Sequence, residues 1–537
     1  MRTKITLSCL LVGIWIGGTV PLMARPASAD YSFNHGSSYV VGGYPPSFIQ
    51  TGVAADSLGR VVVVGTVKDS IFSVRATDVI VLRFRADGFL DPSFGQSGVK
   101  FVDLGAANLS DRVAAVAIDS SDRIVVTCDV DWGSQKDIVV FRLTTAGVVD
   151  ATFTSTNSPP GFFRFDTVIS STSYNDEATC MAIDSSGRIL VGGFSNTPTE
   201  GNNFRILRLT SEGLLDTSFG TGGLYSGVGG SENTINGTDG RVTGIAIRSS
   251  GEILFSCTVG SWATVLGMGA NGGFEFGWPG SNVPNYIQNA VITGIRADAN
   301  GQAIVCGYRP TGATKMFLAR YANFGGSIEW VRDHDFGSTT EQALGLVLQP
   351  DGKIVIGGFS SGGPGILVAR FNSDGTLDSG FEAFTKNVTL ESNEGGTSIA
   401  LTPKGKIALG GYALNTMFVH VLAGESEENW YDDATFYYGY FGQLGRDREA
   451  LAYWYYFRAL GDLVGRSFKG ETALAYKEYY QGLAYFYYTY LYGQYGRLYY
   501  YYLYLGYSEY TSRLAGGDSA GASLYYNYYL SLANSFL

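Results

Sequence analysis

The sequence predicts an all-β fold, a seven-bladed β-propeller closed by its N-terminal strand, followed by a tyrosine-rich α-helical module at the C-terminus. Three observations support this prediction. Glycine accounts for 73 of the 537 residues, which is typical of a chain with many tight turns between short strands. A strand–turn–strand segment recurs along most of the chain, and most of the 36 tyrosines lie after residue 430.

Composition and charge exclude several classes of function. The net charge of −11 disfavours nucleic-acid binding, because affinity for the phosphate backbone depends on Lys and Arg. The chain has only 3 His, at His35, His334 and His420, and no two of them are close in sequence. Their spacing matches neither a multi-histidine metal centre nor a Ser–His–Asp motif. We therefore expect no metal, no cofactor and no catalytic residue from sequence motifs.

Residues 1–29 are typical of a secretory signal peptide. Arg2 and Lys4 give a basic start, an apolar stretch follows, and small residues at 27–29 offer a cleavage site before Asp30. We expect an exported protein that is extracellular, on the cell surface or periplasmic. The alternative interpretation of the same residues is an uncleaved membrane anchor.

Residues 30–423 are predicted to form the propeller, because an apolar strand, a polar turn and a second apolar strand return seven times. Ala178–Gly193 (ATCMAIDSSGRILVGG) and Ala343–Gly358 (ALGLVLQPDGKIVIGG) are two of these segments. Recurrence about every 50 to 65 residues, with four strands in each unit, is typical of propeller blades. Each hairpin turn has a residue suited to a left-handed backbone. These turn residues are Gly59, Asp122, Gly187, Gly251, Gly301, Gly352 and Gly405.

Each hairpin is followed by a third strand, such as DVIVLRF ending at Phe84, and often by a fourth extended stretch, such as Val99–Leu104. The seventh unit ends near Leu422 without this last stretch. Residues 32–41 parallel residues 93–102 and supply the missing piece. We therefore expect the N-terminal strand to complete the last blade and to leave no open edge.

Two segments carry a family resemblance. Asp351–Phe381 contains DGKIVIGGF and ILVARFNSDGTLDSGF, and Arg83–Val99 reads RFRADGFLDPSFGQSGV. These segments resemble the delta-60 repeat, a bacterial propeller unit, and the resemblance extends over about residues 30–423. The resemblance implies an exported propeller and offers no catalytic motif that could be transferred to this chain.

An arginine and an aspartate eight residues apart recur at the end of the third strand. Eight residues across a turn bring the two side chains back together on adjacent strands. We predict structural clamps, because the pairs recur and do not converge at one place. The alternative interpretation is a ring of charged functional sites. The pairs are Arg83 and Asp91, Arg142 and Asp150, Arg208 and Asp216, and Arg370 and Asp378.

Four cysteines remain if the first 29 residues are removed, and none lies in a CxxC pair. Cys128, Cys257 and Cys306 stand where sister segments carry glycine. They are therefore predicted to be small buried residues in strands. A disulfide in an oxidising compartment stays open as an alternative.

Loops after the second strands carry aromatic residues that could bind a ligand. In a propeller, these loops and the blade-to-blade connections share one face. The predicted ligand-binding residues are Trp132, Trp262, Tyr308 and Arg309, because aromatic rings can stack on sugars or anchor a protein partner. The alternative for Tyr308 is that it caps the core of its blade, as do aromatic residues at the same offset in other units.

The composition changes at Gly424. Residues 424–537 are rich in tyrosine, lack proline and carry Ala, Leu, Arg and Glu at helical spacing. Residues 479–508 contain one charge, Arg497, which raises the question of a membrane span. Tyrosine prefers membrane interfaces to hydrocarbon, so a helical surface module is favoured over a buried span. We predict helices near 432–464, 471–493, 496–512 and 519–535.

Two hypotheses of different classes follow. The first is an exported, non-enzymatic binding scaffold with a protein or glycan ligand at the loops of the propeller. Its tyrosine-rich tail would contact the cell envelope or form a homo-oligomer, and it would have no nucleic-acid partner. The alternative is a propeller enzyme, a carboxylate-dependent polysaccharide hydrolase or lyase. Asp129 and Asp131, in CDVDWG, are the acidic pair least typical of turns and the candidate carboxylates of that alternative.

Overall fold

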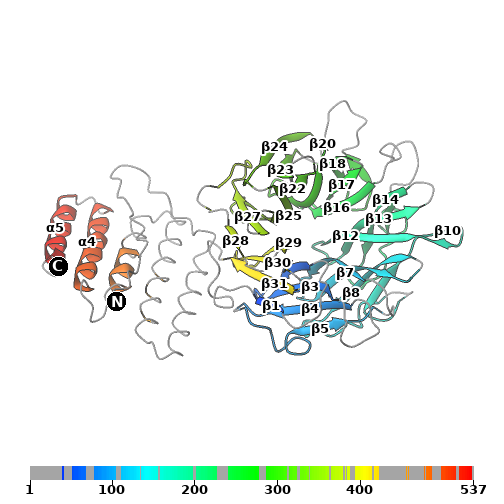
Figure 1. Cartoon of the computed structure of the whole chain (residues 1–537), viewed down its shortest axis with the longest axis horizontal. Helices are drawn as coiled ribbons and strands as arrows, with labels where there is room; N and C mark the ends of the chain where they lie inside the picture. Colours follow the sequence, from blue (N-terminus) through cyan, green and yellow to red (C-terminus); the bar gives the residue numbers. More distant parts are fainter. Residues whose placement is uncertain are drawn as a thin grey trace.

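The computed structural model shows seven antiparallel sheets arranged as blades around a common axis (Figure 1). Inner strands of successive blades contact one another, and the inner strand of the first blade contacts that of the seventh, so the ring is closed. The predicted seven-bladed β-propeller is confirmed. The structure describes residues 39–41 and most of 51–422, except chiefly 68–77, 105–110, 227–239, 277–285 and 388–393, and then residues 451, 455, 458, 477, 479–486, 497–515 and 519–534.

The first three blades run from the inner to the outer strand in chain order. Blade 1 contains β2 (Thr51–Ala55), β3 (Val61–Val67), β4 (Asp78–Phe84) and β5 (Val99–Val102). Blade 2 contains β6 (Arg112–Ile118), β7 (Ile124–Asp131), β8 (Lys136–Leu143) and β9 (Phe162–Phe165). Blade 3 contains β12 (Asn175–Ile183), β13 (Ile189–Thr197), β14 (Gly201–Leu209) and β15 (Leu224–Ser226). A small hairpin of β10 (Val168–Ile169) and β11 (Thr172–Ser173) connects blades 2 and 3.

Blades 4 to 6 follow the same order, with an addition in blade 4. Blade 4 contains β16 (Gly240–Ile247), β17 (Ile253–Val259), β18 (Trp262–Met268) and β19 (Phe274–Phe276), and β20 (Tyr286–Gln288) also pairs with β18. Blade 5 contains β21 (Val291–Ala297), β22 (Ala303–Arg309), β23 (Lys315–Tyr321) and β24 (Ile328–His334). Blade 6 contains β25 (Thr340–Leu348), β26 (Ile354–Ser361), β27 (Gly365–Phe371) and β28 (Phe384–Asn387).

Blade 7 joins the two ends of the propeller. It contains β29 (Glu394–Leu401), β30 (Ile407–Ala413) and β31 (Thr416–Leu422), and its outermost strand is β1 (Tyr39–Val41) from the other end of the chain. Tyr39 lies opposite Val419 and Val41 opposite Met417. The predicted closure by the N-terminal strand is therefore confirmed, and β31 gains a partner on its outer edge.

The hairpin turns have the backbone that their sequence predicts. All seven turn residues named above have positive φ, from 58° at Asp122 to 92° at Gly251. Glycine adopts this left-handed region at little cost, and aspartate is among the other residues that tolerate it. In the first turn, the carboxylate of Asp56 accepts hydrogen bonds from the backbone N–H groups of Leu58 and Arg60 at 3.1 and 2.9 Å. The turns are thus fixed by local hydrogen bonds.

The core lies between neighbouring blades. Alternate residues of a strand point to opposite faces of its sheet, so one strand contributes to two interfaces. Val62 and Val64 belong to a buried cluster with blade 2, whereas Val61 and Val63 belong to one with blade 7. Burial on both faces explains why the second strands are almost entirely apolar. Cys128, Cys257 and Cys306 lie fully buried in these second strands as free cysteines, which confirms their predicted placement.

The predicted Arg–Asp pairs are formed, and they also join neighbouring blades. Arg83 Nε donates to Asp91 Oδ2 at 2.9 Å, and its guanidinium lies 4.7 Å from the centre of the Phe94 ring. The same guanidinium donates to the carbonyl of Thr145 in blade 2. The pairs lie at separate blades, as a structural clamp requires. Equivalent contacts are made by Arg142 to Asp150 and Ser211, by Arg208 to Asp216 and Ala270, and by Arg370 to Asp378.

At three of the four clamps, a glycine of the neighbouring blade packs against the phenylalanine under the arginine. Gly147 has φ 78°, and a Cβ atom there would lie 2.9 Å from the Phe94 ring, so a larger residue does not fit without a shift. In blade 5, Arg320 donates to the carbonyl of Ser373 in blade 6 at 2.6 Å, although no aspartate follows it at the usual distance. The link between blades therefore extends beyond the pairs that the sequence pattern revealed.

The described part of the C-terminal region is helical, as predicted, whereas the helix predicted near 432–464 lies almost entirely outside the described residues. α4 (Arg497–Ala515) and α5 (Ser519–Asn534) lie side by side (Figure 1), and residues 479–486 form a further helical segment. Gly506 allows α4 and α5 to approach closely, because a Cβ atom at this position would lie 2.9 Å from the Cβ atom of Tyr529. Among the helices that the structure describes, none has both the length and the apolar composition needed to span a membrane.

Candidate functional site

All four predicted ligand-binding residues lie at strand ends on one face of the ring. This face carries the connections from second to third strands and those between blades, and we call it the loop face. Trp132 follows β7, Trp262 begins β18, and Tyr308 and Arg309 end β22. The Arg–Asp clamps lie at the opposite ends of the strands, next to the turns between the third and fourth strands. The two features therefore belong to different faces.

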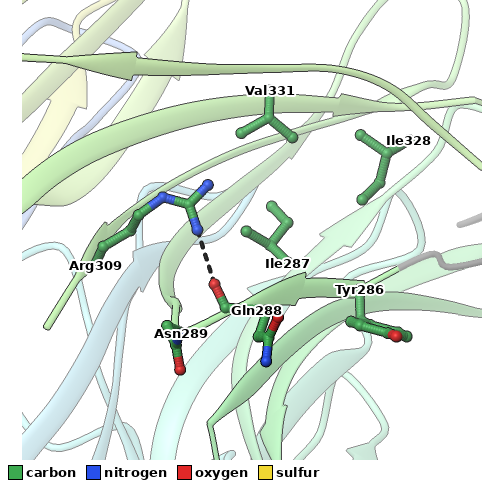
Figure 2. A pocket seen from close by; sticks show the side chains of 7 residues that line it. All are labelled: Tyr286, Ile287, Gln288, Asn289, Arg309, Ile328 and Val331. Carbon is green, nitrogen blue, oxygen red and sulfur yellow. Dashed lines mark hydrogen bonds between the residues drawn. The ribbon is translucent and has the colours of Figure 1, made fainter. Parts of the chain in front are cut away.

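A depression of about 450 Å³ opens between blades 4 and 5. The outer strand of blade 4 is split beside it. β19 pairs with one end of β18, at Gly267 and Met268, and β20 pairs with the other end, from Trp262 to Thr264. The lining residues, shown in Figure 2, are Tyr286, Ile287, Gln288, Asn289, Arg309, Ile328 and Val331.

Arg309 bridges the two blades at this depression. Its Nη1 donates to the backbone carbonyl of Gln288 at 2.8 Å, as Figure 2 shows. Its Nε donates to Asp333 Oδ1 at 2.8 Å, and the guanidinium lies 5.6 Å from the centre of the Phe317 ring. The side chain of Asp333 is 55% exposed, so this ion pair forms a solvent-facing rim.

The structure places Trp262 beside the depression and Tyr308 away from it. Trp262 contacts Tyr286, a lining residue, with ring centroids 3.9 Å apart, and Trp262 is 40% exposed. Tyr308 precedes Arg309 in β22, so its side chain lies on the opposite face of the blade. Cys306 and Ile304, on that same face, pack in the cluster shared with blade 6.

Trp132 lies elsewhere, directly after β7 in blade 2. The guanidinium of Arg164 is 4.5 Å from the centre of its ring, and the ring packs against the buried core of blades 1 and 2. Of the four predicted residues, the structure thus brings Arg309 and Trp262 to the same small region. Trp132 and Tyr308 belong to other parts of the loop face.

Three carboxylates converge near Trp132, and the sequence did not single them out. Asp137 lies in β8, Asp166 follows β9, and Asp176 lies in β12, yet one oxygen of each lies within 4.8 Å of the others. Asp137 and Asp176 have no exposed surface. The cluster therefore forms where the outer part of blade 2 meets the inner strand of blade 3.

Polar neighbours surround this carboxylate cluster. Arg164 Nε donates to Asp137 Oδ2 at 2.6 Å, and Arg164 Nη2 lies 3.9 Å from Asp166 Oδ2. Asp176 accepts hydrogen bonds from the hydroxyl and the backbone N–H of Thr167, at 2.7 and 2.6 Å, and from Ser195. Carboxylate oxygens are ligands for hard divalent cations, but here the guanidinium of Arg164 already supplies a positive charge.

Burial dominates the electrostatics of the cluster. It raises the pKa of Asp137 to about 6, although Arg164 acts in the opposite direction. Burial also raises the pKa of Asp176, against the hydrogen bonds from Ser195 and Thr167. Carboxyl groups with raised pKa values occur both at catalytic sites and in structural networks.

Asp129 and Asp131, the predicted acidic pair, have separate partners. Asp129 is fully buried, accepts a hydrogen bond from Arg112 Nε at 2.8 Å and accepts another from the backbone N–H of Ala178 in blade 3 at 2.6 Å. Burial raises the pKa of Asp129 to about 6. Asp131 accepts a hydrogen bond from the backbone N–H of Gly133 in the following turn. Asp129 thus connects two blades, and Asp131 fixes a local turn.

Two features of the loop face had weak signals in the sequence. Asp137 and Asp176 are far apart in the chain, so only the packing of blade 2 against blade 3 shows that they meet. The available signal was Asp137 itself, a charged residue at the start of the apolar run IVVF. β20 has only three residues, and its pairing beside β19 breaks the four-strand rule of the other blades.

The fold and its repeats define this protein as a seven-bladed β-propeller. The model of a family described as a domain of unknown function (DUF5122) beta-propeller matches residues 59–94, 185–219 and 349–381. Each match ends at or beside the phenylalanine under the clamp arginine of its blade. These matches support a bacterial β-propeller family, and the delta-60 name stays a prediction. Among curated proteins, no sequence matches this chain.

Solved structures share the arrangement of strands at low identity. Raptor from Chaetomium thermophilum is 8% identical with a TM-score of 0.42, over 71% of this chain but only 28% of the Raptor chain. The NanB sialidase from Streptococcus pneumoniae is 10% identical with a TM-score of 0.36, over 72% and 70% of the two chains. The polysaccharide lyase Uly1 is 11% identical with a TM-score of 0.39, over 75% and 95%. Likeness at this level carries no argument about activity.

Proposed function

We propose that this protein is an exported, non-enzymatic β-propeller that binds an extended polypeptide at the depression between blades 4 and 5. Its tyrosine-rich helices attach it to a surface or to another copy. The observation that carries the proposal is the open outer edge of β20 beside Arg309. Among the strands that the structure describes, β20 pairs with β18 alone.

The backbone of β20 supports strand addition. In an antiparallel pair, alternate residues direct their N–H and C=O groups away from the partner strand. Asn289 donates its N–H to the carbonyl of Ser261, so the backbone groups of Asn289 face β18. By alternation, the N–H and C=O groups of Gln288 and Tyr286 point away from β18. The carbonyl of Gln288 is turned outward, since it accepts the hydrogen bond from Arg309. An incoming peptide would pair with the other outward groups of β20, or displace Arg309 from this carbonyl, which is the basis of β-augmentation.

The side chains favour a polypeptide over a glycan. Ile287, Ile328 and Val331 give the depression an aliphatic lining, which suits an apolar side chain. A sugar ring would stack on an open aromatic face, but Trp262 lies against Tyr286 and does not line the depression. The rim ion pair of Arg309 and Asp333 presents a positive and a negative charge with which a bound peptide can interact.

Export and attachment rest on the two ends of the chain. Residues 1–29 lie outside the described residues, and their basic start, apolar stretch and small-residue site support export. In the tail, Leu524, Tyr525 and Tyr528 are 68%, 40% and 60% exposed along one helix. Exposed tyrosines give a large contact area with a hydrogen-bonding tip, which suits a partner surface.

A random peptide library displayed on phage, together with a glycan array, tests the ligand class. We expect selected peptides to bind the mature chain, and Val331→Asp to weaken that binding at least tenfold by placing a charge on the aliphatic lining. Arg309→Ala should weaken it less. Trp132→Phe is the matched control on the same face and should leave binding unchanged. Binding of glycans alone, or equal binding by Val331→Asp, would overturn the proposal.

The role of the tail has its own test. A chain ending at Leu422 keeps all seven blades, including β31. We expect it to remain monomeric in light scattering and to stay in the soluble fraction, whereas the full mature chain associates or sediments with envelope fractions. The same behaviour in both chains would refute this role of the tail.

A second candidate function is a carboxylate-dependent hydrolase or lyase, and the convergence of Asp137, Asp166 and Asp176 favours it. It ranks second because Asp137 and Asp176 are fully buried and already bound by Arg164, Ser195 and Thr167. Release of reducing ends or unsaturated products from a polysaccharide panel, lost in Asp137→Asn, would establish it over the binding role. No turnover by the parent chain would exclude it for that panel.

A further inference from the structure

Two tyrosines of the tail face each other across α4 and α5. The rings of Tyr507 and Tyr526 have centroids 5.2 Å apart at an interplanar angle of 39°. The hydroxyl of Tyr526 donates to the hydroxyl of Tyr507 at 3.4 Å. Since each Cε carbon is bonded to the carbon that carries the hydroxyl, close hydroxyls place Cε carbons of the two rings near each other.

Other tyrosines contact this pair. Tyr507 also lies 5.3 Å from Tyr480 and 6.3 Å from Tyr504, and Tyr526 lies 5.7 Å from Tyr510, measured between ring centroids. The rings thus form a connected group across three helical segments. An electron lost from one ring can be replaced from a ring in contact with it, so oxidation of a neighbouring ring can pass to the central pair.

The tail lacks the residues that normally react first with oxidants. Thiols and thioethers are the usual targets, and none occurs after Met417. Within the propeller, Cys128, Cys257 and Cys306 have no exposed surface. Tyr507 and Tyr526 are only partly buried, so small oxidants can approach them. In the C-terminal tail, aromatic rings are therefore the side chains that an oxidant attacks first.

We infer that Tyr507 and Tyr526 form a site of oxidative tyrosine coupling, at which a dityrosine bond joins α4 to α5 covalently. This inference goes beyond ligand binding by the propeller and does not depend on it. The oxidant is hydrogen peroxide acting through a haem peroxidase, which would be a separate protein. The consequence is a tail whose last two helices cannot separate.

The chemistry of the step balances. Each phenol loses one electron and one proton and becomes a tyrosyl radical. The two radicals combine through a new bond between one Cε carbon of each ring. The hydrogens on those two carbons are then lost as protons, and the two phenolic oxygens are protonated again. In total the pair loses two electrons and two protons, and hydrogen peroxide accepts them with two protons of its own to give two molecules of water.

The sequence makes the product easy to identify. Trypsin cleaves after Arg497 and Arg513, and no Lys or Arg follows Arg513. Tyr507 therefore lies in the peptide 498–513 and Tyr526 in the peptide 514–537. Peroxidase and peroxide are added to the full chain at low concentration, and monomer is isolated before digestion. We expect these two peptides to appear joined, with the loss of two hydrogens and with dityrosine fluorescence.

Phenylalanine variants test the residues. Tyr507→Phe and Tyr526→Phe keep the rings but cannot form the phenoxyl radical, and each should reduce the joined peptide at least tenfold. Tyr528→Phe, on the exposed side of α5, is the matched control and should leave it unchanged. Circular dichroism of each variant checks that the helices persist. Joined peptides that form equally in Tyr507→Phe, or coupling found only between different copies of the chain, would overturn the inference.

Discussion

The guanidinium of Arg83 binds the carboxylate of Asp91, with Nε and Oδ2 2.9 Å apart, and so closes the turn between the third and fourth strands of blade 1. The same guanidinium donates to the carbonyl of Thr145 in blade 2. One side chain therefore holds a turn and a junction between blades. Arg83 is 1% exposed, so its charge depends on these partners for compensation.

Removal of this arginine should be costly. In Arg83→Met, the buried Asp91 loses its nearest counter-charge and keeps only Arg60, at 3.9 Å, and we expect the free energy of unfolding to fall by about 3–5 kcal/mol. Arg83→Lys keeps the charge but not the planar fork that reaches both partners, so an intermediate loss is expected. Urea denaturation of the propeller measures both. Arg85→Met, two residues away at an exposed position, is the control, and a similar loss in it would contradict the assignment.

The repeated parts of the fold were predictable because their determinants are local. Gly59 and Asp122 occupy turns whose left-handed backbone only a few residue types tolerate, and the structure gives both positive φ. The eight-residue spacing of Arg83 and Asp91 spans a single turn. Seven repetitions of such local signals made the blade count and the closing strand accessible from the sequence.

The unique parts of the loop face were not predictable in the same way. Asp137 and Asp176 meet through packing of two blades, and no periodic pattern marks residues that occur once. The sequence predicts Arg309 from its place after a second strand, but its partner Asp333 lies on the outermost strand of the blade. Sequence patterns therefore do not predict the partners of side chains whose contacts are made by residues far away in the chain.

Buried cysteines should resist alkylation. Burial raises the pKa of Cys257 and Cys306 to about 12, and the thiolate is the reactive form. At pH 7, labelling by iodoacetamide should be slower than in the denatured chain by on the order of 1,000-fold, since each pKa unit is worth a factor of ten. Mass spectrometry of a chain that starts at Asp30 measures this. Fast labelling of the native chain, with urea-denatured protein as the control, would contradict the buried placement.

The pH dependence of stability should reflect Asp137. Burial raises its pKa to about 6 in the folded chain, whereas the ordinary value is 3.8. The folded chain therefore binds this proton more tightly than the unfolded chain, and the contribution of Asp137 to stability falls as the pH rises from about 4 to about 6. In Asp137→Asn this component is absent. We expect the parent to lose stability relative to Asp137→Asn over that range, and no further above it.

A second carboxylate provides the control for that measurement. Hydrogen bonds from Thr376 lower the pKa of Asp374 in the folded chain. The contribution of Asp374 to stability is therefore fully present above its ordinary pKa of 3.8 and is lost only as the pH falls below that value. Between pH 4 and 6, the free energy of unfolding of Asp374→Asn, measured by urea denaturation, should thus change with pH in parallel with that of the parent. A parent curve parallel to Asp137→Asn over the same range would show that Asp137 titrates normally.

The closing strand should matter for both stability and solubility. Tyr39–Val41 pair with Met417–Val419, so a chain that begins at Gly42 leaves the outer edge of β31 without its partner. We expect its midpoint of thermal unfolding to fall by roughly 5 °C or more and the exposed edge to promote association. A chain that begins at Asp30 is the control, and a synthetic peptide of residues 36–44 should restore part of the loss. Equal midpoints for the two chains, both monomeric in light scattering, would show that the ring holds together without this strand.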